Sequence, residues 1–188
     1  MKKIILASAS PRRKELLETA GAEFEICVAD VDESIPEGIL PADAAQMTAQ
    51  KKALAVAQSH RDSIVIGADT IVVAADKILG KPKDKADAVE MLSMLSGAEH
   101  QVITGVCIAC GDKEITFAQV SKVKFYELTD EEIGTYVDTN EPMDKAGAYG
   151  IQGRGCTLVE KIEGDYFNIV GLPVAELNRK LKNFLKKG

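Results

Sequence analysis

The sequence of 188 residues lacks an excess of positive charge, because 23 Lys and Arg stand against 29 Asp and Glu and give a formal net charge of −6. Proteins that bind long nucleic acids in general carry the opposite sign, so we expect no DNA or RNA partner. The sequence also lacks any run approaching the roughly 18 apolar residues of a membrane span. The apolar run at residues 4–7 is too short for an export signal. We therefore expect a cytoplasmic protein with no membrane partner.

Cysteine is scarce as well, and four cysteines are too few for a disulfide framework in a chain of this size. Cys107 and Cys110 have the CxxC spacing of zinc and redox sites. They fall, however, in a segment typical of a buried strand, where side chains three residues apart point to opposite faces. A second CxxC is absent, and His60 and His100 are not spaced as partner ligands. We expect reduced core cysteines.

The order of apolar patterns predicts the fold class. The length of 188 residues suits one compact domain over residues 1–188, or two small lobes that share a core. Strand patterns alternate with helix patterns and include one hairpin, so we predict an α/β fold with a mixed β-sheet. The expected strands are residues 4–7, 24–29, 64–75, 102–109 and 114–126. The expected helices are residues 11–20, 42–59, 84–96, 129–137 and a terminal helix from residue 173, with Leu177, Leu181 and Leu185 facing inward. Asp84 can cap its helix, and Thr129 with Glu132 has the pattern of a capping box. Residues 110–113 are the expected turn of the hairpin.

The segment that begins at Ser8 reads Ser-Ala-Ser-Pro-Arg-Arg-Lys and indicates an anion site. Ser10 is a good N-cap and Pro11 suits the first helical position. Three cations then oppose the helix dipole, at a cost of roughly 0.3–1 kcal/mol each when exposed. A phosphate would remove this conflict by accepting from backbone N–H groups, serine hydroxyls and the guanidinium groups of Arg12 and Arg13. The alternative is that both arginines pair with surface acids. No GxxxxGK[ST] motif occurs, so this is not a P-loop.

Asp69 lies inside residues 64–73, a run that otherwise indicates burial. Burial of an unpaired carboxylate is costly, so Asp69 requires a metal, a cation or an adjacent cleft. The alternative is a chain reversal in which Asp69 and Thr70 are turn residues. Glu33 lies in the acidic stretch 30–43, which has no Lys or Arg, and is either a metal ligand or a solvated loop acid.

Two lysines and one glycine-rich segment complete the set of candidate residues. Lys52 in an alanine-rich helix and Lys81 in a turn are of types that most often face water. Residues 144–155 contain four glycines that let backbone approach a ligand, and Gln152 offers an amide able to bind a base edge. The segment lacks the GxGxxG order, so a glycine-rich surface turn is the alternative.

Six motifs occur together in the sequence, in one order and spacing. The motifs are Ser-Ala-Ser-Pro-Arg-Arg at 8–13, Gly-Ala-Asp-Thr at 67–70, Leu-Gly-Lys-Pro at 79–82, Leu-Ser-Gly at 95–97 with His100 and Thr-Gly at 104–105, Asp-Lys-Ala-Gly-Ala-Tyr-Gly-Ile-Gln-Gly at 144–153, and Gly-Leu-Pro at 171–173. Through these motifs the sequence resembles the Maf family of nucleoside triphosphate pyrophosphatases, first described as septum-formation inhibitors. The resemblance covers essentially the whole chain.

The resemblance implies a fold like that of the inosine triphosphate pyrophosphatases (Maf/Ham1-type), with a cleft between two lobes. It also implies cleavage between the α and β phosphates that depends on a divalent cation, Mg²⁺ or Mn²⁺. The residues that match the family's active site include a proton acceptor, substrate-binding groups and metal ligands. These are Asp69 as proton acceptor, Ser8, Arg12, Arg13, Lys52 and Lys81 for the substrate, and Glu33 with Asp69 for the metal. At Lys52 the alignment with the family is ambiguous, because Lys51 stands directly before it.

Arg12, Thr70 and Gln152 match positions that one branch of the family links to a preference for dTTP and UTP, whereas another branch prefers 7-methyl-GTP. The resemblance thus implies a house-cleaning pyrophosphatase for dTTP, UTP and modified pyrimidine nucleotides, with a link to cell division. Two alternatives stay open: a nucleotide-binding regulator of septation with little hydrolysis, and a simple phosphatase. The oligomeric state is open too, a homodimer included.

Overall fold

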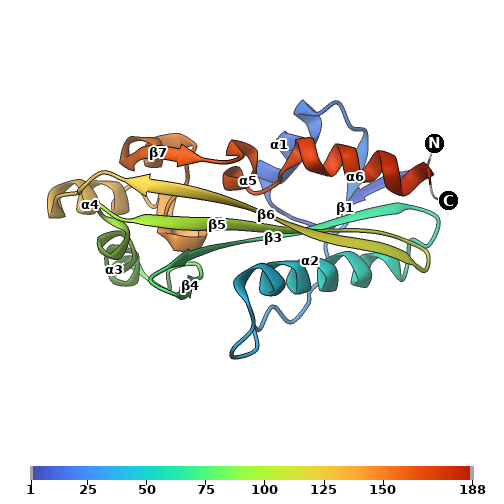
Figure 1. Cartoon of the computed structure of the whole chain (residues 1–188), viewed down its shortest axis with the longest axis horizontal. Coiled ribbons are helices and arrows are strands. Elements are labelled where there is room, and N and C mark those ends of the chain that lie inside the picture. The colour runs from blue at the N-terminus through green and yellow to red at the C-terminus, as the bar shows by residue number, and fades with distance from the viewer. Residues whose placement is uncertain (1, 187–188) are drawn as a thin grey trace. The chain divides into compact units, whose positions relative to one another are not determined.

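The computed structural model describes residues 2–186, and within them the strands form one seven-stranded sheet in the order β2-β1-β3-β5-β6-β7, with β4 beside β3 (Figure 1). β1 pairs in parallel with β2 and β3, whereas β4 pairs antiparallel with β3 and β7 with β6, so the sheet is mixed as predicted. The strands are β1 Ile4–Leu6, β2 Phe24–Ile26, β3 Ile64–Ala74, β4 Lys77–Leu79, β5 Glu99–Cys110, β6 Lys113–Phe125 and β7 Val159–Glu163.

Helices α1 to α4 lie between strands in the chain order, and α5 and α6 follow the last strand. None of the helices among the described residues is long and apolar enough to cross a membrane. The helices are α1 Pro11–Thr19, α2 Pro41–Ala57, α3 Lys85–Leu95, α4 Asp130–Val137, α5 Tyr166–Val170 and α6 Val174–Lys186, with the 3-10 turns η1 Glu141–Asp144, η2 Ala146–Ala148 and η3 Gly153–Leu158.

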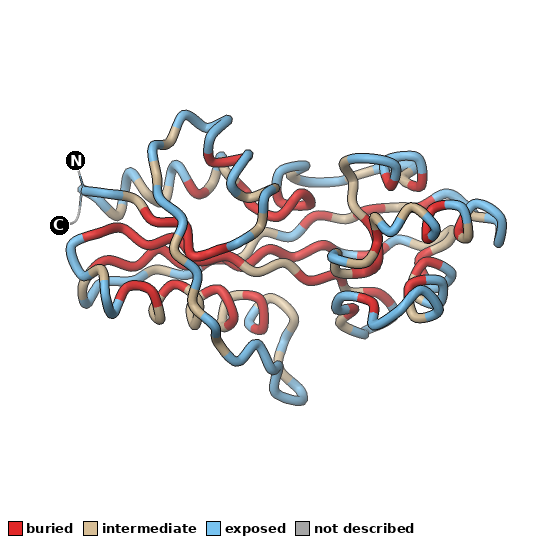
Figure 2. The backbone as a smooth tube through the Cα atoms, turned by 180° about the vertical axis from the view of Figure 1, so that it is seen from behind, coloured by how far each residue is buried: buried red, intermediate tan, exposed pale blue. Residues whose placement is uncertain are grey.

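Two compact units divide the chain. Among the described residues, unit 1 holds 2–69, 104–119 and 171–186, and unit 2 holds 70–103 and 120–170. The long strands β3, β5 and β6 contribute residues to both units, and Figure 2 shows buried residues concentrated along them. The prediction of one domain over residues 1–188 stays a prediction.

In unit 1, helices cover both faces of the strands: α2 lies on one face, and α1 and α6 lie on the other (Figures 1 and 2). Ile5 of β1 belongs to the core that includes the alanines of α2, whereas Ile4 lines a small apolar crevice with Leu17 of α1 and Leu177 of α6. Successive side chains of a strand point to opposite faces, so β1 contributes to both layers.

The alanine-rich helix α2 rests directly on the strands where they carry glycine. A Cβ at Gly67 of β3 would collide with the carbonyl oxygen of Ala49, and a Cβ at Gly105 of β5 would collide with that of Ala45. Both alanines are fully buried. This close approach fixes which face of α2 the strands cover.

In unit 2, β3 turns back into β4 through Ala75 and Asp76, whose φ values of 46° and 60° are typical of a tight hairpin turn. The capping box predicted for α4 is present, since Thr129 Oγ1 accepts from the Glu132 N–H and the Glu132 carboxylate accepts from the Thr129 N–H. The core of this unit includes Phe125, whose ring packs edge-on against the buried ring of Tyr149, with 4.7 Å between the two ring centroids.

The structure corrects two expectations from the sequence. Asp69 and Thr70 lie inside β3, so the alternative of a chain reversal at these residues is wrong. Leu185 is 49% exposed, so the inward face predicted for the terminal helix is wrong there, because the crevice that Leu177 and Leu181 line ends one turn earlier. The short elements β4, β7 and α5 escape prediction because three to five residues show no clear period.

The cysteines are free, as expected from their number and spacing. Cys107 is fully buried in the core of unit 1, and burial raises the pKa of its thiol to about 12. Cys110 is also buried, and its Sγ lies 3.1 Å from Lys2 Nζ. Cys107 and Cys110 are therefore buried residues of one strand, and this explains their CxxC spacing.

Candidate active site

The start of α1 is built as the sequence predicts, with Ser10 as N-cap and Pro11 in the first turn. Ser10 Oγ accepts from the Arg13 N–H at 3.5 Å. Ser8 is buried, and its Oγ accepts from the Ser10 N–H at 3.3 Å and from Arg13 Nη1 at 3.2 Å. Both contacts use Ser8 Oγ as an acceptor, so neither consumes the hydroxyl proton.

Arg13 is the most firmly held cation of this segment. Its Nε donates to the carbonyl oxygen of Gly171 at 2.9 Å, in addition to the bond from Nη1 to Ser8. Burial lowers the pKa of the guanidinium, and the negative charge of Asp69 opposes this shift. Arginine remains charged at neutral pH despite such a shift. The half-buried Arg12 adds a second positive charge beside it, whereas Lys14 is exposed and pairs with Glu18 at 3.6 Å.

Asp69 of β3, Lys52 of α2 and Glu33 of the acidic loop converge on one point. Lys52 Nζ lies 2.9 Å from Asp69 Oδ1 and 3.0 Å from Glu33 Oε2. The Lys52 and Asp69 side chains are 15% and 16% exposed, whereas Glu33 is 56% exposed. The contact of α2 with Gly67, two residues before Asp69, holds the helix close enough for Lys52 to reach the strand. The cation that a buried Asp69 requires is thus Lys52.

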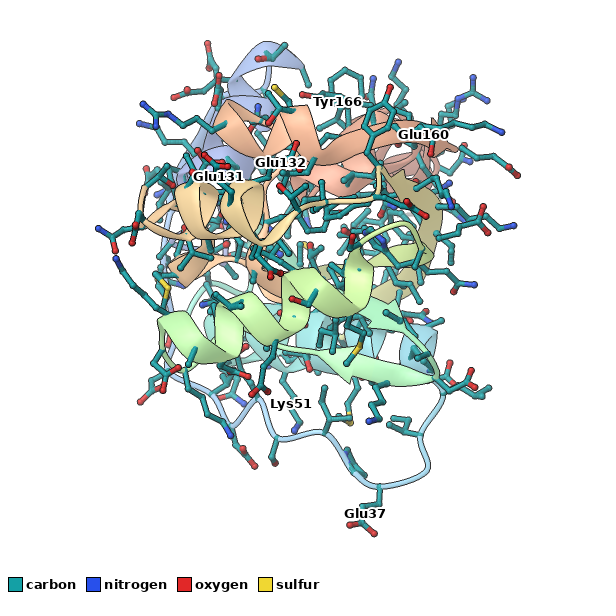
Figure 3. All side chains as sticks on the ribbon, turned by 90° about the vertical axis from the view of Figure 1, so that its left-hand side faces the viewer. Glu37, Lys51, Glu131, Glu132, Glu160 and Tyr166 are labelled. Carbon is teal, nitrogen blue, oxygen red and sulfur yellow. The ribbon has the colours of Figure 1, made fainter. Side chains whose placement is uncertain are left out.

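The neighbouring Lys51 has a different contact from that of Lys52. Its Nζ donates to the carbonyl oxygen of Asp32 at 3.0 Å. The Asp32 carboxylate in turn accepts from the N–H and the hydroxyl of Ser34, and these bonds lower its pKa. Both contacts involve the loop between β2 and α2, whose tip carries the exposed Glu37 (Figure 3). Lys51 therefore anchors the loop that carries Glu33, and Lys52 contacts the acids.

The carboxylates of Glu33 and Asp69 are the groups of unit 1 that fit a divalent cation. Mg²⁺ is commonly bound by one or two carboxylates, with water and substrate phosphates as its other ligands. Two carboxylates that already meet at one ammonium match this requirement for hard oxygen donors. Residues 2–186 contain no group of three or more His, Cys, Asp or Glu side chains placed to hold a metal ion. The protein can thus supply part of a coordination sphere.

Thr70, Lys81 and Gln152 belong to unit 2 and come from three neighbouring segments of it. Thr70 is half-buried in β3, and Lys81 is exposed just after β4. The N–H of Gly147 donates to the carbonyl oxygen of Gly80 at 3.0 Å, so η2 is bound to the residue before Lys81. A Cβ at Gly147 would meet the Val72 side chain at 2.9 Å, so η2 also packs against β3 two residues beyond Thr70.

Sequence reasoning missed the side chains that hold the glycine-rich segment in place. The Glu141 carboxylate accepts from the backbone N–H groups of Arg154 and Gly155 at 3.0 and 3.1 Å, and from the Tyr136 hydroxyl at 3.0 Å. The one signal in the sequence for this arrangement is an aromatic residue at an inward position of α4, in the same stretch of chain as the four closely spaced glycines.

Comparisons with known proteins agree with one another. The sequence model of the family described as Maf-like protein matches residues 3–184. The dTTP/UTP pyrophosphatases of Bacillus cytotoxicus and Bacillus anthracis are each 55% identical over 184 residues, which is 98% of this chain and 96% of theirs. The Staphylococcus aureus Ham1 protein aligns with a TM-score of 0.51 and 15% identity, covering 67% of this chain and 73% of that chain. This structural likeness concerns the fold alone, and it confirms the predicted fold class.

Proposed function

The chain belongs to the Maf family, and we propose that it is a nucleoside triphosphate pyrophosphatase that hydrolyses dTTP and UTP to the monophosphate and pyrophosphate. The observation that carries this proposal is the convergence of Asp69, Lys52 and Glu33 in a chain 55% identical to proteins of that name. The charge pattern is consistent with nucleotide binding, because residues 1–14, which include the start of α1, contain Lys and Arg but no Asp or Glu.

The triphosphate is bound by cations and by the start of α1. Ser8, Arg12 and Arg13 offer a hydroxyl and two guanidinium groups at the N-terminus of α1, and together they suit phosphate oxygens. Lys52 and Lys81 supply further positive charge. Since Arg13 is held by Ser8 and Gly171 before any ligand arrives, its guanidinium is pre-organised for the anion.

Asp69 is the proton acceptor in this proposal. Its carboxylate orients a water molecule and takes its proton, while the water oxygen forms the new bond to phosphorus and the bond between the α and β phosphates breaks. Lys52 holds Asp69 in place and stabilises negative charge that develops on the phosphates. Catalysis then arises mainly from positioning and electrostatics.

Glu33 and Asp69 would hold Mg²⁺ or Mn²⁺ with the phosphates as further ligands. Such a cation neutralises phosphate charge and polarises the bound oxygens. Lys52 contacts both carboxylates and therefore keeps them together when the substrate is absent.

Pyrimidine preference is assigned to Arg12, Thr70 and Gln152. The Gln152 carboxamide presents one donor group and one acceptor to a base edge, and it makes no capping bond to η3. A location in the cytoplasm, a homodimer and a link to septum formation remain predictions from the sequence.

The experiment incubates the protein with dTTP, UTP and 7-methyl-GTP, with and without Mg²⁺ or Mn²⁺, and identifies the products. Monophosphate and pyrophosphate from dTTP and UTP are expected. Release of free phosphate would indicate a phosphatase, and binding without hydrolysis would indicate a nucleotide-binding regulator.

Asp69→Asn keeps the shape but removes the base, so its turnover should fall at least about 100-fold. Asp62→Asn, a change at an exposed acid, is the matched control. Near-wild-type turnover of Asp69→Asn with intact metal binding contradicts the assignment.

A further inference from the structure

We propose that Glu141 and Tyr136 form a latch that positions Gln152, and that Glu141 thereby determines nucleotide selectivity without touching the substrate. This inference rests on the proposed function, because it takes Gln152 as a residue that binds the base. All the residues of the latch belong to unit 2.

The Glu141 carboxylate has all its partners within the loop and the helix before it. Oε1 accepts from the Tyr136 hydroxyl at 3.0 Å and from the Gly155 N–H at 3.1 Å, and Oε2 accepts from the Arg154 N–H at 3.0 Å. Burial raises the pKa of this carboxyl, but the bonds from Arg154, Gly155 and Tyr136 outweigh burial, so the net shift is downward. A carboxylate engaged by three donors positions the backbone and is not a proton acceptor for catalysis.

The Tyr136 hydroxyl closes the other side of the latch. It accepts from the Gly150 N–H at 3.2 Å while it donates to Glu141. Tyr136 is buried, and burial raises the pKa of its hydroxyl, so the proton needed for the bond to Glu141 is always present at neutral pH. The bonds at residues 150, 154 and 155 therefore bracket Gln152 on both sides.

Close packing makes the latch rigid. A Cβ at Gly153, where φ is +67°, would lie 2.8 Å from Glu141 Oε2, and a Cβ at Gly155 would collide with the carbonyl oxygen of Gly150. The glycines at 153 and 155 are thus required by the approach of Glu141 and of the loop's own backbone. Ala148 is also held at a positive φ of 57° while fully buried. A segment fixed at so many points holds the backbone at Gln152, from which the amide extends, in one position.

Position matters here because discrimination by a hydrogen-bonding amide depends on its fit to the base. An amide that is misplaced no longer favours the correct base, whereas the residues assigned to the phosphates are not part of the latch. Loss of the latch should therefore reduce the preference for pyrimidine nucleotides and raise KM for them, while kcat changes little.

The test compares Glu141→Gln, Tyr136→Phe and Glu160→Gln. Glu141→Gln replaces one acceptor oxygen by a donor, and Tyr136→Phe removes only the hydroxyl. Glu160 is exposed on β7, so Glu160→Gln is the same chemical change without a latch (Figure 3). The ratio of kcat/KM for dTTP over dGTP is expected to fall roughly tenfold in the two latch variants and to stay constant in the control.

A double-mutant cycle with Gln152→Ala separates positioning from a general structural role. If Glu141 acts through Gln152, Glu141→Gln causes no further loss of selectivity in the Gln152→Ala background. Unchanged selectivity in Glu141→Gln overturns the proposal, and so does a loss that adds in full to that of Gln152→Ala. Amide exchange at Arg154 and Gly155 is measured in parallel, and it should become faster in Glu141→Gln than in the control.

The two proposals fail in different ways. If the wild-type protein releases no pyrophosphate, the proposed activity fails, and the same variants are compared by calorimetric binding of dTTP and dGTP. Selectivity in binding that does not respond to Glu141→Gln then overturns the latch independently of hydrolysis.

Discussion

The ammonium of Lys52 lies 2.9 Å from Asp69 Oδ1, and each of the two side chains has about one sixth of its surface exposed. Their elements meet because α2 packs against Gly67 of β3 without an intervening side chain. The same ammonium contacts the more exposed Glu33 at 3.0 Å. An ion pair in such an enclosed setting is stronger than one on the surface, so Lys52 organises both acids.

Removal of this ammonium should impair catalysis much more than removal of its neighbour. Lys52→Met leaves Asp69 and Glu33 without the cation that holds them, and kcat/KM for dTTP is expected to fall at least about 100-fold. Lys51→Met removes an exposed contact to a backbone carbonyl and is expected to stay within about threefold of wild type. Steady-state pyrophosphate release measures both. Equal losses in the two variants would contradict the assignment of Lys52.

Arg13 should not be replaceable by lysine. Its Nε and Nη1 bind Gly171 and Ser8 together, and a single ammonium cannot reproduce that two-pronged contact. For Arg13→Lys we expect kcat/KM for dTTP to fall about tenfold or more. Lys14→Met, which removes an exposed cation from the same helical turn, is the control. A loss in Lys14→Met as large as that in Arg13→Lys would show that only general charge matters.

Much of the fold was accessible from the sequence because local signals agree with the tertiary structure. Ser10 caps α1, Asp84 caps α3 and Thr129 forms the capping box of α4, each at the predicted residue. The turn between β5 and β6 also falls where Gly111 and Asp112 predict it. Caps and tight turns depend on residues that are close together in the sequence, so the sequence pattern is enough to predict them.

The candidate site was less accessible because its contacts join residues far apart in the chain. Asp69 could be recognised as an acid in a buried run, but its partner could have been any cation. Lys51 and Lys52 are the same type of residue. The packing of α2 against Gly67 and Gly105 sets the orientation of the helix, and in that orientation Lys52 contacts Asp69. The role of Glu141 is invisible for a similar reason, since its bonds to Arg154 and Gly155 are set by how the loop folds back.

Alanine should have opposite effects on stability at two glycines, one at the contact of α2 with β3 and one in α4. Gly67→Ala places a methyl group against the Ala49 carbonyl and the Ala53 backbone, so unfolding free energy should fall by about 1–3 kcal/mol or more. Gly134 lies in α4 with no atom within 4 Å of an added Cβ, so Gly134→Ala should stabilise by roughly 0.5–1 kcal/mol. Urea unfolding of both variants measures the difference. A neutral Gly67→Ala would contradict the close packing.

His100 should make stability depend on pH. The ring is buried, its Nε2 lies 2.8 Å from the Tyr149 hydroxyl, and its Nδ1 has no hydrogen-bond partner among residues 2–186. Burial lowers its pKa to about 4, from an ordinary value of 6.5. Between these values the unfolded chain binds a proton that the folded protein does not, so stability is lost as pH falls from about 6.5 to about 4.

The size of this effect follows from the shift. Between about pH 7.5 and pH 5 His100 should remove roughly 2 kcal/mol of unfolding free energy. His100→Gln keeps a group able to bond the Tyr149 hydroxyl but does not titrate, so its stability should fall less than that of wild type over this range. Urea unfolding at several pH values gives the difference between the two proteins, in which contributions from carboxylates cancel. His60→Gln, at a half-buried histidine, should retain the wild-type pH dependence. Parallel stability curves for wild type and His100→Gln would show that His100 is not the group responsible.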